Sequence, residues 1–354
     1  MQSKGADELG ANTSFKWNVG PYIDGLFTQS GLGVVYEVTI RVKRLTESFD
    51  SFYINFEQED DLSHAYDFIR QTLERYEGIV GSINLMDKRR LISMLSDNPN
   101  LQTSTILSEQ QIAQIAKKKS VPAWTVVGTV YGDKLIVNAA KKRVKALAKR
   151  HASKVIFSND LLVKTGQFVF SKLPKFVFPS VHKQLDSLNS GMEIMQGKPN
   201  TIAINLAYWR NKAIRPEDSA NLDPAQDKCG LLWYAPLVPM KKEKLVEYVQ
   251  HVRGICVRYG VDPMITFTNL KHDLIDSTVP ILFDANDAKQ VALAQDCLTE
   301  LVEKGLTKGY VPYRLNIEQQ KTLFNNDLSS YRLMQGVYAH TDPKQILQAG
   351  RYGK

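Results

Sequence analysis

The sequence has 354 residues, a hydrophobic fraction of 43% and a net charge of +8. This length exceeds one minimal domain and allows two, each with a real hydrophobic core. No apolar run approaches the roughly 20 residues that a membrane span needs, and residues 1–8 lack the apolar core of a secretory signal. The three cysteines are widely spaced, and the six histidines do not pair with metal-ligand spacing. We therefore expect a cytoplasmic protein with no membrane span and no metal site.

The first part of the chain is polar and contains glycine up to about residue 20. Glycines then bracket a short apolar piece over residues 20–33, and apolar residues alternate from Val34 to Val42. The period of two predicts a strand over residues 34–42. Glycines before a strand let the backbone approach a phosphate or a flat ring closely, but on these residues alone a tight turn is the simpler interpretation.

From Ser48 onward, predicted strands alternate with amphipathic helices. The strands are expected over residues 49–56, 78–85, 125–131, 154–157, 231–237, 264–268 and 279–283, and the helices over residues 62–76, 137–147, 245–256 and 291–301. Short links between them indicate an α+β fold, a large, mainly antiparallel sheet with helices packed on it. The stretch over residues 170–227 has weaker periodicity, and we expect a long excursion with one helix near residues 182–188 that covers a site.

Much of the basic excess lies between Lys117 and Lys154. Such a run is compatible with a polyanion partner, for example a nucleic acid, whose binding would weaken steeply with salt. In the predicted helix over residues 137–147, however, the lysines fall opposite the apolar positions, as in an ordinary amphipathic helix. We therefore expect no nucleic-acid partner and keep the nucleic-acid-binding module as an alternative.

The sequence contains few motifs that indicate a particular chemical activity. It has no dinucleotide fingerprint after a strand, no phosphate-binding loop and no nucleophile elbow. Residues 309–315 follow a helical pattern, are β-prone and contain Tyr313 and Arg314, a phenol beside a guanidinium that together can bind an oxyanion. Taken alone, such a dipeptide is more often one core ring and one exposed cation. Asp273 and Asp276, near His272, are interpreted as part of a solvated turn.

Several stretches, taken in order, carry a resemblance to a known family. They are GPYIDGLFTQS over residues 20–30, PAW over 122–124 with YG at 131–132, CGLLWYAP over 229–236, TFT over 266–268, YR at 313–314, and residues 342–351. Together they resemble the vanillyl-alcohol oxidase and para-cresol methylhydroxylase family of FAD-linked oxidases, in the family's order and over nearly the whole chain.

The resemblance implies three parts. Residues 1–44 would be a C-terminal remnant of the FAD-binding domain, residues 45–316 the cap or substrate domain, and residues 317–354 a segment returning to the flavin domain. The N-terminal half of the flavin domain is then missing. The remaining flavin contacts implied are Gln29, Ser30, Gly33, Val34 and, more weakly, Arg351. The loop that would carry a flavin-linking histidine, residues 273–278, has none, so the expected FAD is non-covalent, and the usual Ala-Pro-Gly near the C-terminus is replaced at residues 348–350.

By the same resemblance, the expected reaction is oxidation of a para-substituted phenol or similar alcohol by hydride transfer to flavin N5. Tyr313 and Arg314 would hold the phenolic oxygen as a phenolate, and they are the expected catalytic residues. The chain would need a second polypeptide with the missing flavin-binding half, or would form a homo-oligomer, because a cap surface without its flavin domain exposes an apolar patch. The alternative is a non-catalytic, cap-like remnant or binding protein without flavin.

Overall fold

The computed structural model describes residues 21–101, 105–158, 189–211, 215–216, 221–269, 271–324 and 328–347. It divides into two compact units, one of residues 46–313 and one of residues 1–45 together with 314–354. Within the described residues, no helix is both long and apolar enough to cross a membrane. The helix predicted near residues 182–188 lies outside the described residues.

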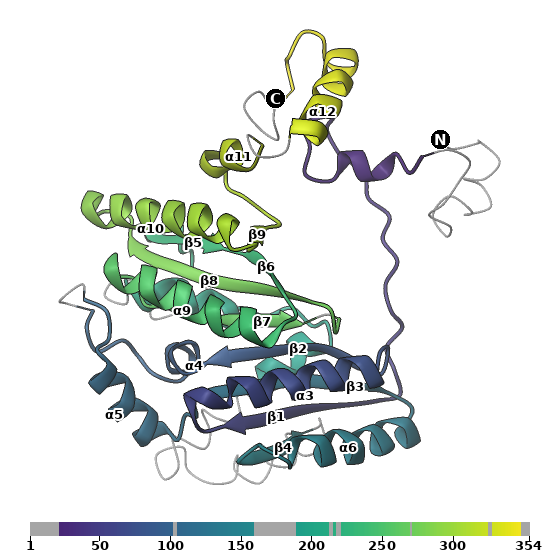
Figure 1. Cartoon of the computed structure of the whole chain (residues 1–354), viewed down its shortest axis with the longest axis vertical. Helices are drawn as coiled ribbons and strands as arrows, with labels where there is room; N and C mark the ends of the chain where they lie inside the picture. Colours follow the sequence, from purple (N-terminus) through teal and green to yellow (C-terminus); the bar gives the residue numbers. More distant parts are fainter. Residues whose placement is uncertain are drawn as a thin grey trace. The chain divides into compact units, whose positions relative to one another are not determined.

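The larger unit is built on a nine-stranded sheet, which confirms the predicted α+β fold (Figure 1). The strand order is β4-β1-β3-β2-β7-β8-β6-β9, with β5 also paired to β8, and every described pairing of named strands is antiparallel. The strands are β1 (Ser48–Phe56), β2 (Val80–Asp87), β3 (Trp124–Gly132), β4 (Lys154–Ser158), β5 (Cys229–Tyr234), β6 (Pro236–Pro239), β7 (Thr266–Asn269), β8 (Leu274–Asp284) and β9 (Val311–Pro312).

Four long helices lie along one face of this sheet (Figure 1): α3 (Leu62–Arg75), α6 (Lys134–Ala148), α9 (Lys242–Arg258) and α10 (Ala288–Thr307). Shorter helices are η2 (Glu59–Asp61), α4 (Lys88–Leu95), α5 (Glu109–Lys119) and η3 (Ile202–Trp209). Aspartate caps begin α6 and α10, where Asp133 and Asp287 accept hydrogen bonds from backbone N–H groups of the first turn. Helix α6 buries Val137, Ala140 and Val144, so the amphipathic interpretation of the basic run is confirmed for this helix.

The smaller unit contains η1 (Asp24–Phe27), α11 (Ile317–Phe324) and α12 (Leu328–Thr341) in its described residues. The strand predicted over residues 34–42 is not formed. This segment is extended but highly exposed, with 77% of Val34 and 94% of Tyr36 accessible. Alternation alone could not produce a strand, because a strand also needs a neighbour for its backbone hydrogen bonds.

The core between the sheet and the long helices follows the alternation of β1. Phe52, Ile54 and Phe56 are almost fully buried, and the Phe52 ring contacts Phe68 of α3 edge-on at 6.3 Å between centroids. Opposite Phe52 on β3 is Gly128, where an added Cβ would lie 2.3 Å from the Phe52 ring. The absent side chain at Gly128 therefore makes room for the ring.

Replacing Gly128 by alanine is expected to lower the free energy of unfolding by about 1–3 kcal/mol, the usual range for overpacking a core. Gly254, in an exposed interior position of α9 with no atom near its absent Cβ, is the matched control. The Gly254→Ala variant should gain about 0.5–1 kcal/mol from helix propensity. Urea unfolding of both variants measures the change in the free energy of unfolding, which should have opposite signs in the two. Equal changes in both variants would contradict the packing argument.

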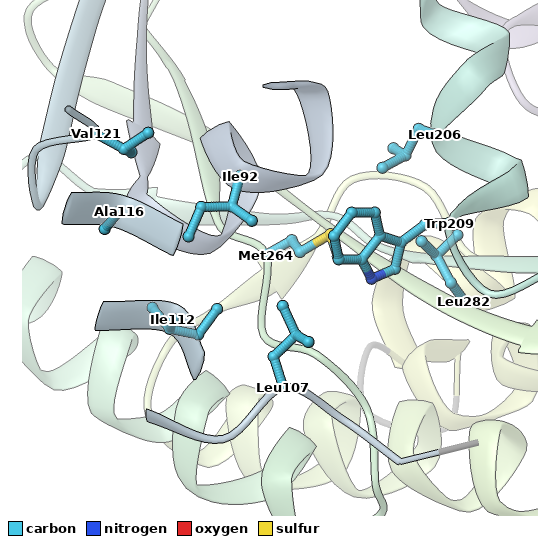
Figure 2. Close-up of a cluster of buried hydrophobic side chains, with 9 residues drawn as sticks. All are labelled: Ile92, Leu107, Ile112, Ala116, Val121, Leu206, Trp209, Met264 and Leu282. Atoms are coloured by element: carbon cyan, nitrogen blue, oxygen red, sulfur yellow. The ribbon is translucent and has the colours of Figure 1, made fainter. Parts of the chain in front are cut away.

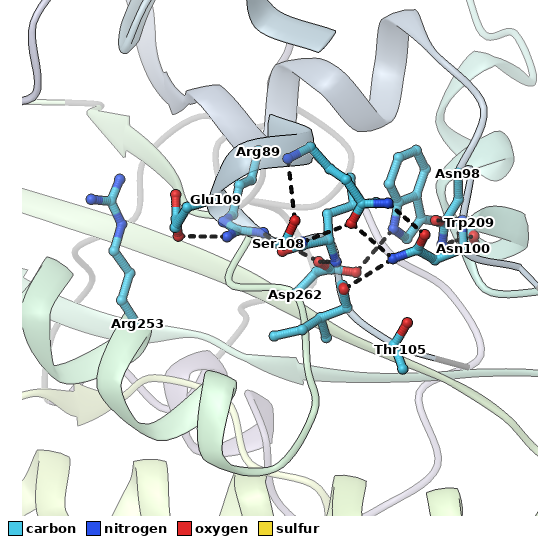
Figure 3. Close-up of polar contacts among 12 residues, drawn as sticks. Arg89, Asn98, Asn100, Thr105, Ser108, Glu109, Trp209, Arg253 and Asp262 are labelled. Carbon is cyan, nitrogen blue, oxygen red and sulfur yellow. Dashed lines mark hydrogen bonds and ion pairs between the residues drawn. The ribbon is translucent and has the colours of Figure 1, made fainter. Parts of the chain in front are cut away.

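A second hydrophobic cluster lies where α4, α5 and η3 meet (Figure 2). Its buried members are Ile92, Leu107, Ile112, Ala116, Val121, Leu206, Trp209, Met264 and Leu282. Beside it, Asp262 is buried within a polar network that includes Arg89, Glu109 and Trp209 (Figure 3). This cluster and network join three short helices, which contribute few residues each to the main core.

Candidate functional site

The face of the sheet opposite the four long helices, called the far face here, is identified by its strand register. Shorter helices cover part of it, since Leu282 of β8 packs with Leu206 and Trp209 of η3. Phe267 of β7 contacts Tyr248 of α9, with ring centroids 5.6 Å apart, so Phe267 points to the helices. Its partner on β8 is Ser277, and the next pair, Thr268 with Asp276, therefore points to the opposite face. This register places Asp276 on the far face.

A row of directly paired residues crosses this face. From β9 to β1 it reads Val311, Leu237, Asp276, Thr268, Asn84, Val127 and Tyr53. The Thr268 hydroxyl donates to Asn84 Oδ1 at 2.8 Å, and Asp276 is the one charged residue of the row. Polar side chains in the middle of a sheet face are better suited to a ligand or a polar interface than to a hydrophobic core.

Tyr313 reaches this face from the short edge strand β9. The chain just before β9 is fixed by Tyr310, which is fully buried and whose hydroxyl donates to Lys244 O at 3.1 Å. Pro312 pairs with Pro236 at the edge of the sheet, where a missing N–H is tolerated. The half-buried Tyr313 then donates its hydroxyl hydrogen to Asp276 Oδ2 at 3.2 Å. Arg314, the next residue, is exposed and belongs to the smaller unit.

Asp276 is the residue that sequence reasoning missed. The interpretation of residues 273–278 as a loop is wrong from Leu274 onward, because these residues form the first part of β8. The signal was present in the alternation of Ile275, Ser277 and Val279, which are all buried. The alternation was not recognised because Ser277 is polar and because Asp273 and Asp276 lie before and within the series.

Four of the flavin-contact residues expected in the smaller unit lie close together in the chain, within residues 29–34. Gln29 adopts a left-handed backbone with φ of 53°, and Gly31 N donates to the Tyr338 hydroxyl on α12 at 3.3 Å. Ser30 Oγ is buried without a hydrogen-bond partner in the described part of the chain. Val34 is exposed, and Arg351 lies outside the described residues. A buried hydroxyl that still lacks a partner fits a loop that contacts a polar group of a bound cofactor.

Several of the titratable groups with large pKa shifts lie on the side of the sheet that carries the four long helices. Burial raises the pKa of Tyr234, Tyr248 and Tyr310, whose rings pack together where α9 meets the sheet. Burial also raises the pKa of Asp87 to about 6, against the opposing effect of Arg253 and of two backbone N–H donors. These groups belong to the core, so perturbed pKa values do not locate the site in this protein.

Asp87 gives a stability prediction with a defined sign. Its pKa of about 6 in the folded state lies above the roughly 4 of an unfolded chain, so the folded state binds the extra proton. This contribution is complete below about pH 4 and is lost as pH rises through 6, a change of about 3 kcal/mol. An asparagine keeps the acceptor for Arg90 N and Ile265 N without titrating. Relative to wild type, Asp87→Asn should therefore gain stability between pH 4 and 7.

Chemical unfolding of wild type and Asp87→Asn at pH 4, 5, 6 and 7 measures this difference. The exposed Asp273, replaced by asparagine, serves as the charge-matched control. A constant difference between wild type and Asp87→Asn across this range would contradict the raised pKa.

No family model matches the chain. The chain is 27% identical over 351 residues to 1'-carboxy-chondrochloren decarboxylase of Chondromyces crocatus, covering 97% of this chain and 63% of that protein. It is 21% identical over 353 residues to the flavoprotein subunit of 4-cresol dehydrogenase (hydroxylating) of Pseudomonas putida, covering 97% and 60%. The chain thus spans less than two thirds of the length of these relatives.

The fold is shared with two solved structures. One is p-cresol methylhydroxylase with substrate bound, with a TM-score of 0.76 at 20% identity over 96% of this chain and 59% of that one. The other is 4-ethylphenol oxidase of Gulosibacter chungangensis in complex with isoeugenol, with a TM-score of 0.76 at 19% identity over 94% and 59%. The resemblance to the vanillyl-alcohol oxidase and para-cresol methylhydroxylase family and the cap-domain fold are confirmed.

Proposed function

We propose that this chain is the cap and C-terminal part of an FAD-linked oxidoreductase that oxidises a para-substituted phenol. The observation that carries the proposal is the Tyr313 hydroxyl, which is held beside polar residues of the far face and comes directly before Arg314 in the chain. The relative of 21% identity is a flavoprotein subunit that acts on 4-cresol by its name, which supports a flavin and a phenol.

FAD, when bound, supplies the hydride acceptor, and the protein supplies orientation and charge. Gln29, Ser30 and Gly33 are the described residues that we assign to FAD, with Val34 beside them and Arg351 as a weaker candidate. Arg314 donates hydrogen bonds to the phenolic oxygen of the substrate, and Tyr313 makes the second contact to the same oxygen. We assign a non-covalent FAD, because residues 273–278 contain no histidine.

A partner polypeptide is part of the proposal. Leu274, Trp233 and Val311 share the far face in the register and are each more than 40% exposed. Exposed apolar side chains gathered on one face usually mark an interface. We assign this face to a flavin-binding polypeptide, in keeping with relatives that are longer than this chain.

Two other functions compete with phenol oxidation. The relative of 27% identity is by its name a decarboxylase, which favours a substrate with a carboxyl group near the reacting carbon. A non-catalytic, cap-like binding protein is the second alternative, favoured by the partial coverage of both relatives. Activity assays distinguish the first alternative from the proposal. Phenol oxidation predicts activity on a para-alkyl phenol, and the decarboxylase alternative predicts activity on a para-carboxyalkyl phenol.

The visible absorbance spectrum of the purified chain, alone and after adding FAD, is the first test. In complex with the flavin-binding polypeptide, we expect flavin bands that stay with the protein through gel filtration and that bleach when a 4-alkylphenol is added without oxygen. Ser30→Ala should weaken flavin retention without changing the far-UV circular dichroism. Retention without bleaching by any phenol would favour the decarboxylase or binding alternatives, and no retention would show that this chain does not hold FAD.

A further inference from the structure

The end of the sheet farthest from β9 carries two adjoining pockets, both within the larger unit. In the strand order, β4 and β1 lie at one end and β9 lies at the other. One pocket, of about 430 Å³, is lined mainly by apolar side chains and is called the apolar pocket. The other, of about 470 Å³, is lined mainly by polar and charged side chains and is called the basic pocket. Ligand pockets usually have volumes of roughly 300–1,000 Å³.

The apolar pocket lies on the far face of the sheet. Tyr53 belongs to the row of paired residues that crosses this face, and Ile156 on β4 is the partner of Tyr53. Both side chains therefore point away from the four long helices. Leu91 and Leu95 of α4 also line the pocket, together with Pro122. Such a lining suits the apolar body of a ligand, for example an aromatic ring beside Tyr53.

The two pockets meet along a shared wall. Asn55, Ser120 and Val121 line both of them. Val121 is buried in the hydrophobic cluster of Figure 2, so core packing fixes this part of the wall. The Asn55 amide is oriented by Thr125, whose hydroxyl donates to Asn55 Oδ1 at 3.3 Å. Among the described residues, none accepts a hydrogen bond from Asn55 Nδ2, so these donors are available to a ligand.

Positive side chains outnumber negative ones around the basic pocket. Lys88, Lys117 and Lys154 line it from α4, α5 and β4, and Glu57 is the acidic residue in its described lining. Lys88 pairs with Glu59 at 3.4 Å, whereas Lys117 and Lys154 make no ion pair within the described ranges. Cations that line one pocket raise its electrostatic potential, and a bound anion lowers their mutual repulsion.

We propose that the two pockets together bind an amphiphilic anion, an organic carboxylate whose apolar body occupies the apolar pocket and whose carboxylate occupies the basic pocket. Lys117 and Lys154 pair with the carboxylate, and the Asn55 amide donates to it where the pockets meet. The site goes beyond the proposed function, because its residues lie at the other end of the sheet from Tyr313 and require neither flavin nor a second polypeptide.

The probe is 2-naphthoate, a carboxylate with an apolar aromatic body, and 2-naphthamide is its uncharged counterpart of similar shape. Calorimetric titration of the full chain should show saturable binding of one 2-naphthoate and weaker binding of 2-naphthamide. Acetate, which lacks the apolar body, should not compete at the same concentration. A variant with Lys117→Gln and Lys154→Gln should bind 2-naphthoate roughly 3- to 10-fold more weakly, a modest loss because solvent weakens the interactions of exposed charges. Its affinity for 2-naphthamide should not change.

Matched controls cover both pockets. Lys118 and Lys119 follow Lys117 on α5 but line neither pocket, so Lys118→Gln with Lys119→Gln should bind 2-naphthoate as wild type does. Ile156→Glu introduces a charge into the apolar pocket at a position that is 41% exposed, and it should abolish binding. Leu135→Glu, at an 82% exposed position of α6, should leave binding unchanged. Far-UV circular dichroism verifies that each variant is folded.

Three results would overturn the inference. The first is the absence of saturable 2-naphthoate binding by the full chain. The second is an unchanged affinity in the Lys117→Gln, Lys154→Gln variant, or a loss equal to that of the Lys118→Gln, Lys119→Gln control. The third is binding of 2-naphthamide as tight as that of 2-naphthoate. Flavin retention and phenol oxidation are measured separately, so the proposed function stands or fails independently of these results.

Discussion

Replacing Asp262 by alanine is expected to lower the free energy of unfolding by about 3–5 kcal/mol, the cost of breaking a buried ion pair by removing one partner. Asp262 is 6% exposed and accepts from Leu107 N at 3.1 Å and Trp209 Nε1 at 3.3 Å. It also accepts from Arg89 Nη1 at 3.4 Å, and the Arg89 side chain is nearly as buried (Figure 3). The alanine variant would leave these buried donors without their carboxylate.

The same network contains its own control. Glu109 also pairs with Arg89, at 2.7 Å, but its side chain is 86% exposed. Exposed pairs contribute about 0–1 kcal/mol, so Glu109→Ala should change the free energy of unfolding by no more than that. Asp262→Asn keeps one acceptor oxygen and should lie between the two alanine variants.

Urea unfolding followed by tryptophan fluorescence measures all three variants, because Trp209 lies in the network and in the hydrophobic cluster of Figure 2. An unchanged urea dependence, with a shifted midpoint, would assign the effect to the folded state. Equal losses for Asp262→Ala and Glu109→Ala would mean that burial does not set the strength of this network.

Periodicity predicted the strands and helices of the larger unit well because each of them also has a partner there. The strand expected over residues 49–56 is observed as Ser48–Phe56, paired on both sides by β3 and β4. The equally regular alternation over residues 34–42 has no strand beside it in the described part of the chain, and it stays extended and exposed. A hydrophobic pattern indicates which face of a segment can be buried. Whether the segment pairs as a strand depends on a neighbouring strand elsewhere in the protein.

The candidate site was predictable only in part. The dipeptide Tyr313-Arg314 stood out by its chemistry and by its place among family-like stretches, but its interaction partner Asp276 lies 37 residues away. That contact results from a strand order in which β8 and β9 flank β6. No local signal links the two residues, and the assignment of Tyr313, Arg314 and the flavin contacts remains a prediction for experiment.

Replacing Arg314 by alanine is expected to lower kcat/KM for a para-substituted phenol by roughly 10- to 150-fold in the flavin-containing protein. This range corresponds to the loss of a hydrogen bond to a charged group, about 1.5–3 kcal/mol, at 1.4 kcal/mol for each factor of ten. The guanidinium stays charged at every accessible pH and offers several donors in one plane. It can therefore hold the phenolic oxygen of the substrate and afterwards hydrogen-bond the carbonyl oxygen of the quinone methide.

The comparison with lysine separates charge from geometry. Arg314→Lys keeps the positive charge but loses the planar arrangement of donors, so we expect an activity between those of Arg314→Ala and wild type. Arg332, an exposed arginine on α12, is the matched control, and Arg332→Ala should leave kcat/KM unchanged. Steady-state kinetics with a 4-alkylphenol, beside far-UV circular dichroism of each variant, makes the measurement. Full activity in a folded Arg314→Ala variant would remove Arg314 from the site and leave Tyr313 as the contact to the phenolic oxygen.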